Sequence, residues 1–307
     1  MSSERRAPTY HSGNRSIAPN ASAPDAARAA SMQFLANLAK DVSSGTVDLP
    51  CFPDVVIRVR KALSNPNTNP KQVVTIVGTE PRLAAKLLQT ANSAAYNPTG
   101  KPLTDLRSAI TRLGHQMVQS ATMAFAMQQM RDAEQLYSIA QKLSGLWKES
   151  ISVASISQVV ASRTRVQPDE AFLTGLLHGM GRLYVMVRAV GQSNKLLADQ
   201  DFSDLVSSWE GAIGKAVLEN WGFAEEMATA VGNQSDYGRL HDDPADLSDV
   251  LIVSKALGGV LHDPAQCAVA MNEVGSFKTI GLTEKDCAEI LMQAEAQLGS
   301  LQNALGC

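Results

Sequence analysis

The sequence predicts an all-α protein with two helical lobes, on three observations. Apolar residues recur at spacings of three and four through most of the chain, as they do on one face of a helix. Strand signals are nearly absent, because no stretch keeps a period-two alternation and no Asn-Gly hairpin occurs. The chain has 307 residues, of which 45% are hydrophobic and 19% charged, so it can bury one large core or two smaller ones.

The chain opens with a segment unlike the rest. Residues 1–30 are rich in Ser, Ala, Pro, Asn and Arg without periodicity, which predicts a disordered leader. Helical spacing begins at Ser31 and stops at Gly45, a residue type that often ends helices. We expect residues 31–130 to form an N-terminal lobe, in which Pro81 suits a first helical turn. The helices of this lobe are expected over residues 31–44, 54–63, 71–77, 81–91, 106–113 and 115–130.

The same helical spacing continues toward the C-terminus. Residues 131–262 are expected to form the second lobe, and residues 263–307 a C-terminal loop and helix packed on it. Thr283 followed by Asp286 resembles a capping box, which places the start of the last helix. The helices expected here cover residues 132–144, 146–162, 169–178, 183–191, 204–221, 224–234, 245–261 and 284–301.

Composition argues against several classes of function. The net charge is -3, and no clustered basic face of the kind that binds nucleic acid stands out. No apolar run reaches the roughly 18 residues that span a bilayer. We therefore expect a cytoplasmic protein with no nucleic-acid or membrane partner and no cofactor. The four cysteines are widely spaced without a C-x-x-C pair, which argues against a zinc knuckle or a disulfide framework: Cys51, Cys267, Cys287 and Cys307.

Four short segments of the expected N-terminal lobe carry a recognisable pattern. They are Leu49-Pro50-Cys51-Phe52-Pro53, Glu80-Pro81-Arg82-Leu83, Asn92-Ser93-Ala94-Ala95-Tyr96 and Ile110-Thr111-Arg112-Leu113-Gly114. In combination they resemble the HDOD family, an HD-related output domain of bacterial signalling proteins, over roughly residues 47–261. The resemblance implies a non-catalytic regulatory module whose second lobe is a degenerate HD-like helical domain. The signature residues are Pro50, Pro53, Pro81, Asn92, Ser93, Ala94, Tyr96, Leu113 and Gly114.

The segment around Asn92 and Ser93 has two interpretations. Both side chains can bond free backbone groups at a helix end, and Tyr96 adds an apolar body with a polar tip. A helix-terminating motif explains this pattern, and a partner-binding surface is the alternative. We favour helix termination.

The segment Leu176-Leu177-His178-Gly179-Met180-Gly181-Arg182-Leu183 resembles the metal-binding turn of HD-type phosphohydrolases, but Gly179 stands in place of the aspartate. A catalytic HD domain needs a first His, a His-Asp pair and a distal Asp, because imidazole and carboxylate hold an ion and leave positions open for water and phosphate. Glycine offers no side-chain oxygen. Alignment with the family makes these the degenerate positions: Glu149, His178, Gly179, Glu210, Gln234, Ser235 and Lys255.

So few ligands cannot hold a catalytic metal. We therefore predict no metal and no catalytic residue, and we interpret His178 as a buried histidine bonded to a neighbouring group. Glu149 and Lys255 carry opposite charges at aligned ligand positions. We hypothesise that they form an ion pair, with their charged atoms within about 4 Å, that ties helices together in place of the metal.

Two literal His-Asp dipeptides lie outside this pattern. His241-Asp242 and His262-Asp263 each have a proline close behind, which predicts surface loops rather than ligand-bearing helices. His115 follows Gly114 at an expected helix start and is interpreted as structural.

Three functions follow from these observations. The first, implied by the HDOD resemblance, is a regulatory module of bacterial signal transduction that binds signalling proteins, with a link to cyclic di-GMP, stress or motility control. The second is a nucleotide or anion sensor, in which Lys255 and the backbone of the Gly179–Gly181 turn hold phosphate without metal. The third is a residual metal-dependent phosphohydrolase. The sequence identifies neither the partner nor the oligomeric state.

Overall fold

The computed structural model describes residues 23–45, 47, 49–65, 68–93, 96–98, 100–190, 200–261 and 266–305. Within these ranges every regular element is a helix and no strand occurs, so the predicted all-α class is confirmed. No helix in this part of the chain has the length and apolar character needed to cross a membrane. Residues 1–22 of the leader expected over residues 1–30, the signature residue Ala94, the His262-Asp263 dipeptide and Cys307 lie outside the described residues.

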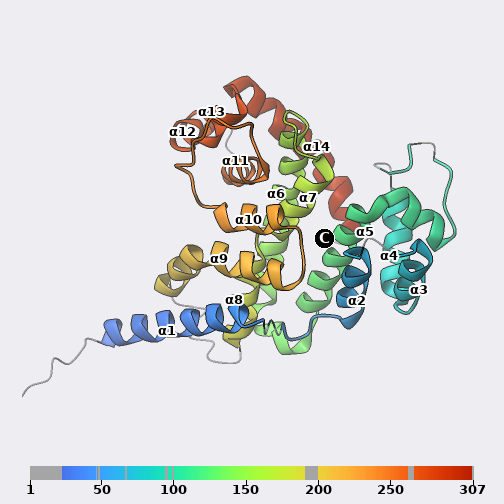
Figure 1. The fold of residues 1–307 in the computed structure, drawn as a ribbon, viewed down its shortest axis with the longest axis horizontal. Helices are drawn as coiled ribbons and strands as arrows, with labels where there is room; N and C mark the ends of the chain where they lie inside the picture. Colours follow the sequence, from blue (N-terminus) through green and yellow to red (C-terminus); the bar gives the residue numbers. More distant parts are fainter. Residues whose placement is uncertain are drawn as a thin grey trace, which may run out of the picture.

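The N-terminal lobe contains α2 (Asp54–Leu63), α3 (Pro70–Gly78), α4 (Pro81–Ala91) and α5 (Leu106–Arg131), as Figure 1 shows. Valines at helical spacing form the buried faces of α2 and α3, and α3 begins with a capping box between Asn69 and Gln72. Gly114 has a φ of 70° and kinks α5 into two helical segments. The two helices expected on either side of Gly114 are thus present.

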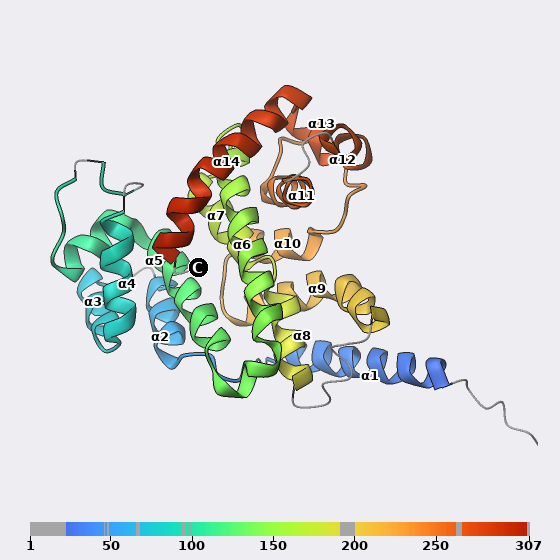
Figure 2. The same ribbon diagram turned by 180° about the vertical axis from the view of Figure 1, so that it is seen from behind.

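The second lobe is arranged around α6, which packs against α7, α11 and α14 (Figure 2). On one side of α6, α8 packs against α9 and α9 packs against α10. The elements of the lobe and of the C-terminal segment are η1 (Glu134–Ile139), α6 (Ala140–Ala161), α7 (Pro168–Leu177), α8 (Met180–Val190), α9 (Gln200–Asn220), α10 (Glu225–Asn233), α11 (Leu247–Gly259), α12 (Cys267–Glu273), α13 (Ser276–Ile280) and α14 (Glu284–Leu305).

Two helix boundaries in this lobe were wrong. The helix expected over residues 132–144 is a 3-10 turn, η1, and α6 then runs without interruption through Gly145. Gly145 is exposed and has no neighbour near the place of a Cβ, so nothing in the packing ends the helix there. The helix expected from Leu183 begins earlier, at Met180, because Gly181 lies inside α8 and packs against α9.

Helix α1 (Ala23–Ser43) corrects the expected domain organisation. It begins at Ala23, within the segment interpreted as a disordered leader, and it packs against α9 of the second lobe rather than within the N-terminal lobe. Leu35, Leu38 and Val42 are buried, and the Phe34 ring lies 6.1 Å from the Phe202 ring between centroids. Sequence proximity suggested the first lobe, but this apolar stripe fits the surface of α9.

The C-terminal segment also contains more structure than the expected loop and helix. Helices α12 and α13 precede α14, whose start is closed by the predicted bonds between Thr283 and Asp286. Helix α14 packs on α6, where Ser155 Oγ donates to the carbonyl of Ala294 at 3.0 Å, and it also reaches α4 and α5. It therefore contacts both lobes rather than only the second.

Candidate functional site

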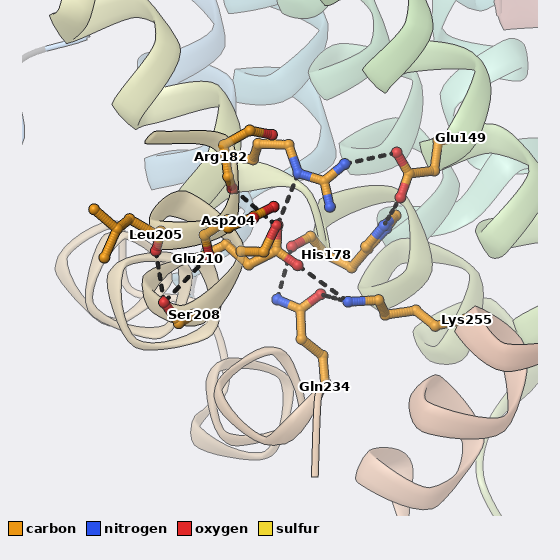
Figure 3. A network of polar contacts seen from close by, with 11 residues as sticks. Glu149, His178, Arg182, Asp204, Leu205, Ser208, Glu210, Gln234 and Lys255 are labelled. Atoms are coloured by element: carbon orange, nitrogen blue, oxygen red, sulfur yellow. Dashed lines mark hydrogen bonds and ion pairs between the residues drawn. The ribbon is translucent and has the colours of Figure 1, made fainter. Parts of the chain in front are cut away.

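Helices α6 to α11 bring most of the degenerate positions to one place in the second lobe (Figure 3). In Figure 3 the polar side chains point toward one another from different helices, so residues far apart in the sequence share one site. The contributors are Glu149 from α6, His178 from the end of α7, Arg182 from α8, Glu210 from α9, Gln234 from the end of α10 and Lys255 from α11.

Two carboxylates and two cations form the centre of this network. Arg182 Nη1 donates to Glu149 Oε2 at 2.9 Å, and Arg182 Nε donates to Glu210 Oε2 at 2.7 Å. Lys255 Nζ donates to the other oxygen of Glu210 at 3.2 Å. Glu210 is 3% exposed, and burying an unpaired carboxylate is costly. The two cations thus neutralise a charge that water cannot reach.

In place of the hypothesised ion pair between Glu149 and Lys255, a series of ion pairs connects these two residues. Each residue pairs with another member of the network, and Arg182 together with Glu210 lies between them. Sequence reasoning missed Arg182, although the signal was present. Arg182 stands four residues after His178, in the same segment that resembles the metal-binding turn, and it is the cation of that segment.

His178 has the structural role predicted for it. Its ring is 1% exposed, and Nδ1 donates to the carbonyl of Gly175 at 2.7 Å. The other ring nitrogen, Nε2, lies 3.6 Å from Glu149 Oε1, which is long for a hydrogen bond. Gln234 Nε2 donates to the backbone carbonyl of His178 at 3.1 Å, and Gln234 Oε1 accepts from Lys255 at 2.9 Å. Gln234 therefore joins the helix turn to the charged network.

The glycine turn is closed to ligands. A Cβ on Gly179 would lie 2.7 Å from Leu146 Cδ1, so a leucine fills the space that an aspartate would need. A Cβ on Gly181 would lie 1.9 Å from the backbone oxygen of Glu210, so α8 and α9 touch backbone to backbone. Both glycines are buried. The burial of this turn disfavours the expected binding of phosphate through its amides.

A cleft of about 690 Å³ opens beside the network. Glu149, Arg182 and Lys255 line its polar side, and the exposed Ser235 and Tyr237 lie at its edge. Ser235, predicted as a degenerate ligand position, lines the cleft, and the bonds of the network described above do not involve it. Any molecule in this cleft would meet a surface on which carboxylates and cations already satisfy one another.

The charges of the network shift one another's protonation. The pKa of Glu149 is lowered to about 2, because the His178 ring faces its carboxylate and the positive charge of Arg182 adds to the effect, against the opposing effect of burial. Burial lowers the pKa of Arg182, but its bonds to Glu210 and Glu149 outweigh this and raise it. Burial and the two carboxylates raise the pKa of Tyr237. Glu149 and Arg182 are thus both charged at neutral pH.

Glu149 should contribute to the acid sensitivity of the fold. Because its pKa is lower in the folded state than the ordinary value of 4.5, the unfolded chain takes up a proton that the folded chain does not between about pH 4.5 and pH 2. Stability from this group is present above that window and is lost as the pH falls through it. In urea titrations across this range, Glu149→Gln should show a shallower loss of stability than wild type. Parallel curves would contradict the assignment.

A second polar cluster joins the loop after α10 to α11. The buried carboxylate of Asp249 pairs with Arg239 at 2.6 Å and with His241 at 2.9 Å, and it accepts from Ser276 at 2.8 Å. Arg239 also pairs with Asp246 at 2.7 Å. His241 lies in a loop as predicted, but its ring belongs to this cluster rather than to an open surface.

The same cluster is the group within the described residues whose donor atoms best match a metal site. Atoms of His241, Asp246 and Asp249 lie within 4.8 Å of one another. The Arg239 guanidinium already contacts both carboxylates, so a cation of the protein stands where an ion would bind. The cluster is a brace between the loop and α11.

The signature segment around Asn92 terminates a helix, as we favoured. Asn92 Nδ2 donates to the carbonyl of Leu103 at 2.8 Å, and the amide of Leu103 donates to Asn92 Oδ1 at 2.7 Å. Ser93 Oγ donates to the carbonyl of Thr90 at 2.7 Å. One amide side chain thus substitutes for a backbone partner and holds the connection to α5 against the end of α4.

Asn92→Ala should lower the free energy of unfolding by about 2 kcal/mol, because it leaves a partly buried amide and carbonyl of Leu103 without partners. Urea unfolding followed by circular dichroism measures the change. Ser93→Ala removes one bond at the same helix end, from Ser93 Oγ to the carbonyl of Thr90, and should lose less. Equal losses in the two variants would show that the paired bonds to Leu103 are not the cause.

The fold and the site together define a class of protein. It is an all-helical scaffold in which paired side chains fill the HD-type ligand positions. The family model described as HDOD domain matches residues 49–237. The chain belongs to the HDOD domain family. The matched range includes Glu149, His178, Glu210 and Gln234, and ends before Lys255.

Individual relatives are distant. An uncharacterized protein of Treponema pallidum (strain Nichols) is 22% identical over 206 residues, which cover 63% of this chain and 39% of that protein. The chain therefore matches well under half the length of this curated relative.

Solved structures share the fold. A protein of Shewanella amazonensis SB2B, provisionally named a metal-dependent phosphohydrolase, has a TM-score of 0.69 and 24% identity, covering 90% of this chain and 99% of that one. An HDOD domain protein of unknown function from Geobacter sulfurreducens has a TM-score of 0.60 and 19% identity, covering 89% and 97%. A provisionally named signal transduction protein of Marinobacter aquaeolei VT8 has a TM-score of 0.56 and 20% identity, covering 91% and 66%. At these sequence identities, the structural similarities show the fold alone.

Proposed function

We propose that this protein is a non-catalytic HDOD module that acts in signal transduction by binding other proteins. Membership of the HDOD family supports the signalling role, and the provisional name of the Marinobacter aquaeolei structure agrees with it. The pathway, whether cyclic di-GMP, stress or motility control, would be set by the partner.

One observation carries the non-catalytic part of the proposal. Arg182 and Lys255 contact three of the four carboxylate oxygens of Glu149 and Glu210 at the aligned ligand positions. A divalent ion would have to displace both cations to gain these ligands, and it would find neither an aspartate at residue 179 nor room for one. The network instead joins the six helices α6 to α11, which is a structural use of the aligned positions.

Metal content and hydrolysis test this proposal. The purified chain, incubated with Mn²⁺, Mg²⁺ or Zn²⁺ and then desalted, should contain substoichiometric metal by mass spectrometry and should not hydrolyse bis(p-nitrophenyl) phosphate or cyclic di-GMP. Stoichiometric metal together with hydrolysis that His178→Ala abolishes would overturn the proposal and establish the residual phosphohydrolase.

The alternative function is ligand sensing in the cleft beside the charged network. The charges of Arg182 and Lys255 are already balanced by carboxylates, which disfavours a phosphate group. Calorimetric titration with cyclic di-GMP and common nucleotides should therefore show no binding. Saturable binding that Lys255→Met removes would replace the protein-binding proposal with a sensor.

A further inference from the structure

A groove of about 580 Å³ lies between α2 and α3 of the N-terminal lobe. Figure 1 shows these two helices apart from α8 to α11 of the second lobe. The buried faces of these helices, with Val59 and Val73, point into the lobe. The groove is open to solvent, and its two apolar lining residues are Ala62 and Ile76, which also pack against the core. The groove thus has a small apolar floor formed by these two side chains, and its lining comes from α2, α3 and the loop between them.

The rim of the groove is basic. Arg58, Lys61 and Lys71 line it, and the lining includes no acidic side chain. Arg58 is paired with Asp54 at 3.0 Å, an exposed contact of little strength. In the described part of the chain no carboxylate forms an ion pair with Lys61 or Lys71. A positive rim in a chain of net charge -3 runs against the overall charge of the protein.

We propose that this groove, lined by Arg58, Lys61, Ala62, Lys71 and Ile76, docks an acidic amphipathic segment of a protein partner. The apolar floor takes the apolar side chains of the segment, and the lysines face its carboxylates. A nucleic-acid backbone needs a larger cluster of cations and gains little from an apolar floor, so a peptide fits better. The inference rests on the proposed protein-binding role and names the chemistry of the partner.

The groove can be tested with a designed probe. The probe is a fluorescein-labelled peptide about four helical turns long, with leucine at helical spacing and glutamate elsewhere, and its matched control has lysine in place of every glutamate. Fluorescence anisotropy with the full chain should show saturable binding of the acidic peptide that weakens as salt rises, and much weaker binding of the lysine peptide.

Two variants separate the charge of the rim from the shape of the floor. Lys61→Glu with Lys71→Glu should weaken binding of the acidic peptide by about tenfold or more. The control Lys278→Glu with Lys285→Glu changes the net charge equally on α13 and α14 and should leave binding unchanged. Ala62→Leu fills the groove without changing charge and should also weaken binding. Circular dichroism confirms that each variant is folded.

Several results would overturn the inference. They are no binding of the acidic peptide, equal binding by the Lys61/Lys71 variant, equal binding of the lysine peptide, or preferred binding of a mixed-sequence DNA duplex. These results leave the metal and hydrolysis assays untouched, so failure of the groove is distinguishable from failure of the non-catalytic role.

Discussion

Gly181→Ala should lower the free energy of unfolding by about 3 kcal/mol, because α8 and α9 must separate to admit one methyl group. A Cβ at residue 181 would lie 1.9 Å from the backbone oxygen of Glu210 and 2.8 Å from the amide nitrogen of Gly214. Backbone atoms cannot swing aside as a flexible side chain can. Urea unfolding of the full chain, monitored by circular dichroism, measures the loss.

Gly145→Ala is the matched control for this prediction. Gly145 is exposed inside α6 and has no atom within 4 Å of the place of a Cβ. Alanine there should stabilise the chain by about 0.5–1 kcal/mol, since glycine loses more backbone freedom in a helix. If the two variants were equally stable, the close crossing of α8 and α9 would not be a real constraint.

Arg182→Met should cost about 3 kcal/mol at neutral pH, because it removes one of the two cations from the buried carboxylate of Glu210. Glu149 loses its cation as well, but it is partly exposed and contributes less. Equilibrium urea unfolding at neutral pH gives the value.

Two comparisons identify the origin of this loss. Adding Glu149→Gln to Arg182→Met removes the carboxylate that has lost its cation and leaves Glu210 paired with Lys255, so it should restore part of the stability. Arg163→Met breaks a more exposed pair with Glu289 and should cost about 1 kcal/mol or less. An Arg182 variant no less stable than the Arg163 variant would show that the network does not hold the second lobe together.

Much of the fold could be predicted because local patterns along the sequence indicate it. The bounds of α2 and α4 follow from apolar spacing and from proline at a helix start, and the break at Gly114 follows from a residue that tolerates a positive φ. The predictions that were wrong depended on how helices pack, which local patterns do not show. Gly145 does not end a helix, since glycine at an uncrowded helix surface costs too little to stop one held by buried residues on both sides.

The candidate site, like the fold, could be predicted only in part. Alignment predicted which positions had lost their metal ligands, and the structure brings Glu149, His178, Glu210, Gln234 and Lys255 together. The alignment did not predict which of these side chains pair with one another. Arg182 was missed because it stands at no ligand position of the HD pattern, and the brace around Asp249 was missed because its members come from separate elements.

The sequence by itself determined that the chain is helical, that it resembles the HDOD family, and that a glycine stands where a metal-binding aspartate would be. These conclusions rest on residue identity and on spacing along the chain, which a sequence displays directly. Only the tertiary structure decided that Leu146 fills the empty position, that Gly181 joins two helices, and that Arg182 stands between the carboxylates. Such contacts depend on how distant helices pack, because burial makes an unpaired charge costly and thereby selects its partner.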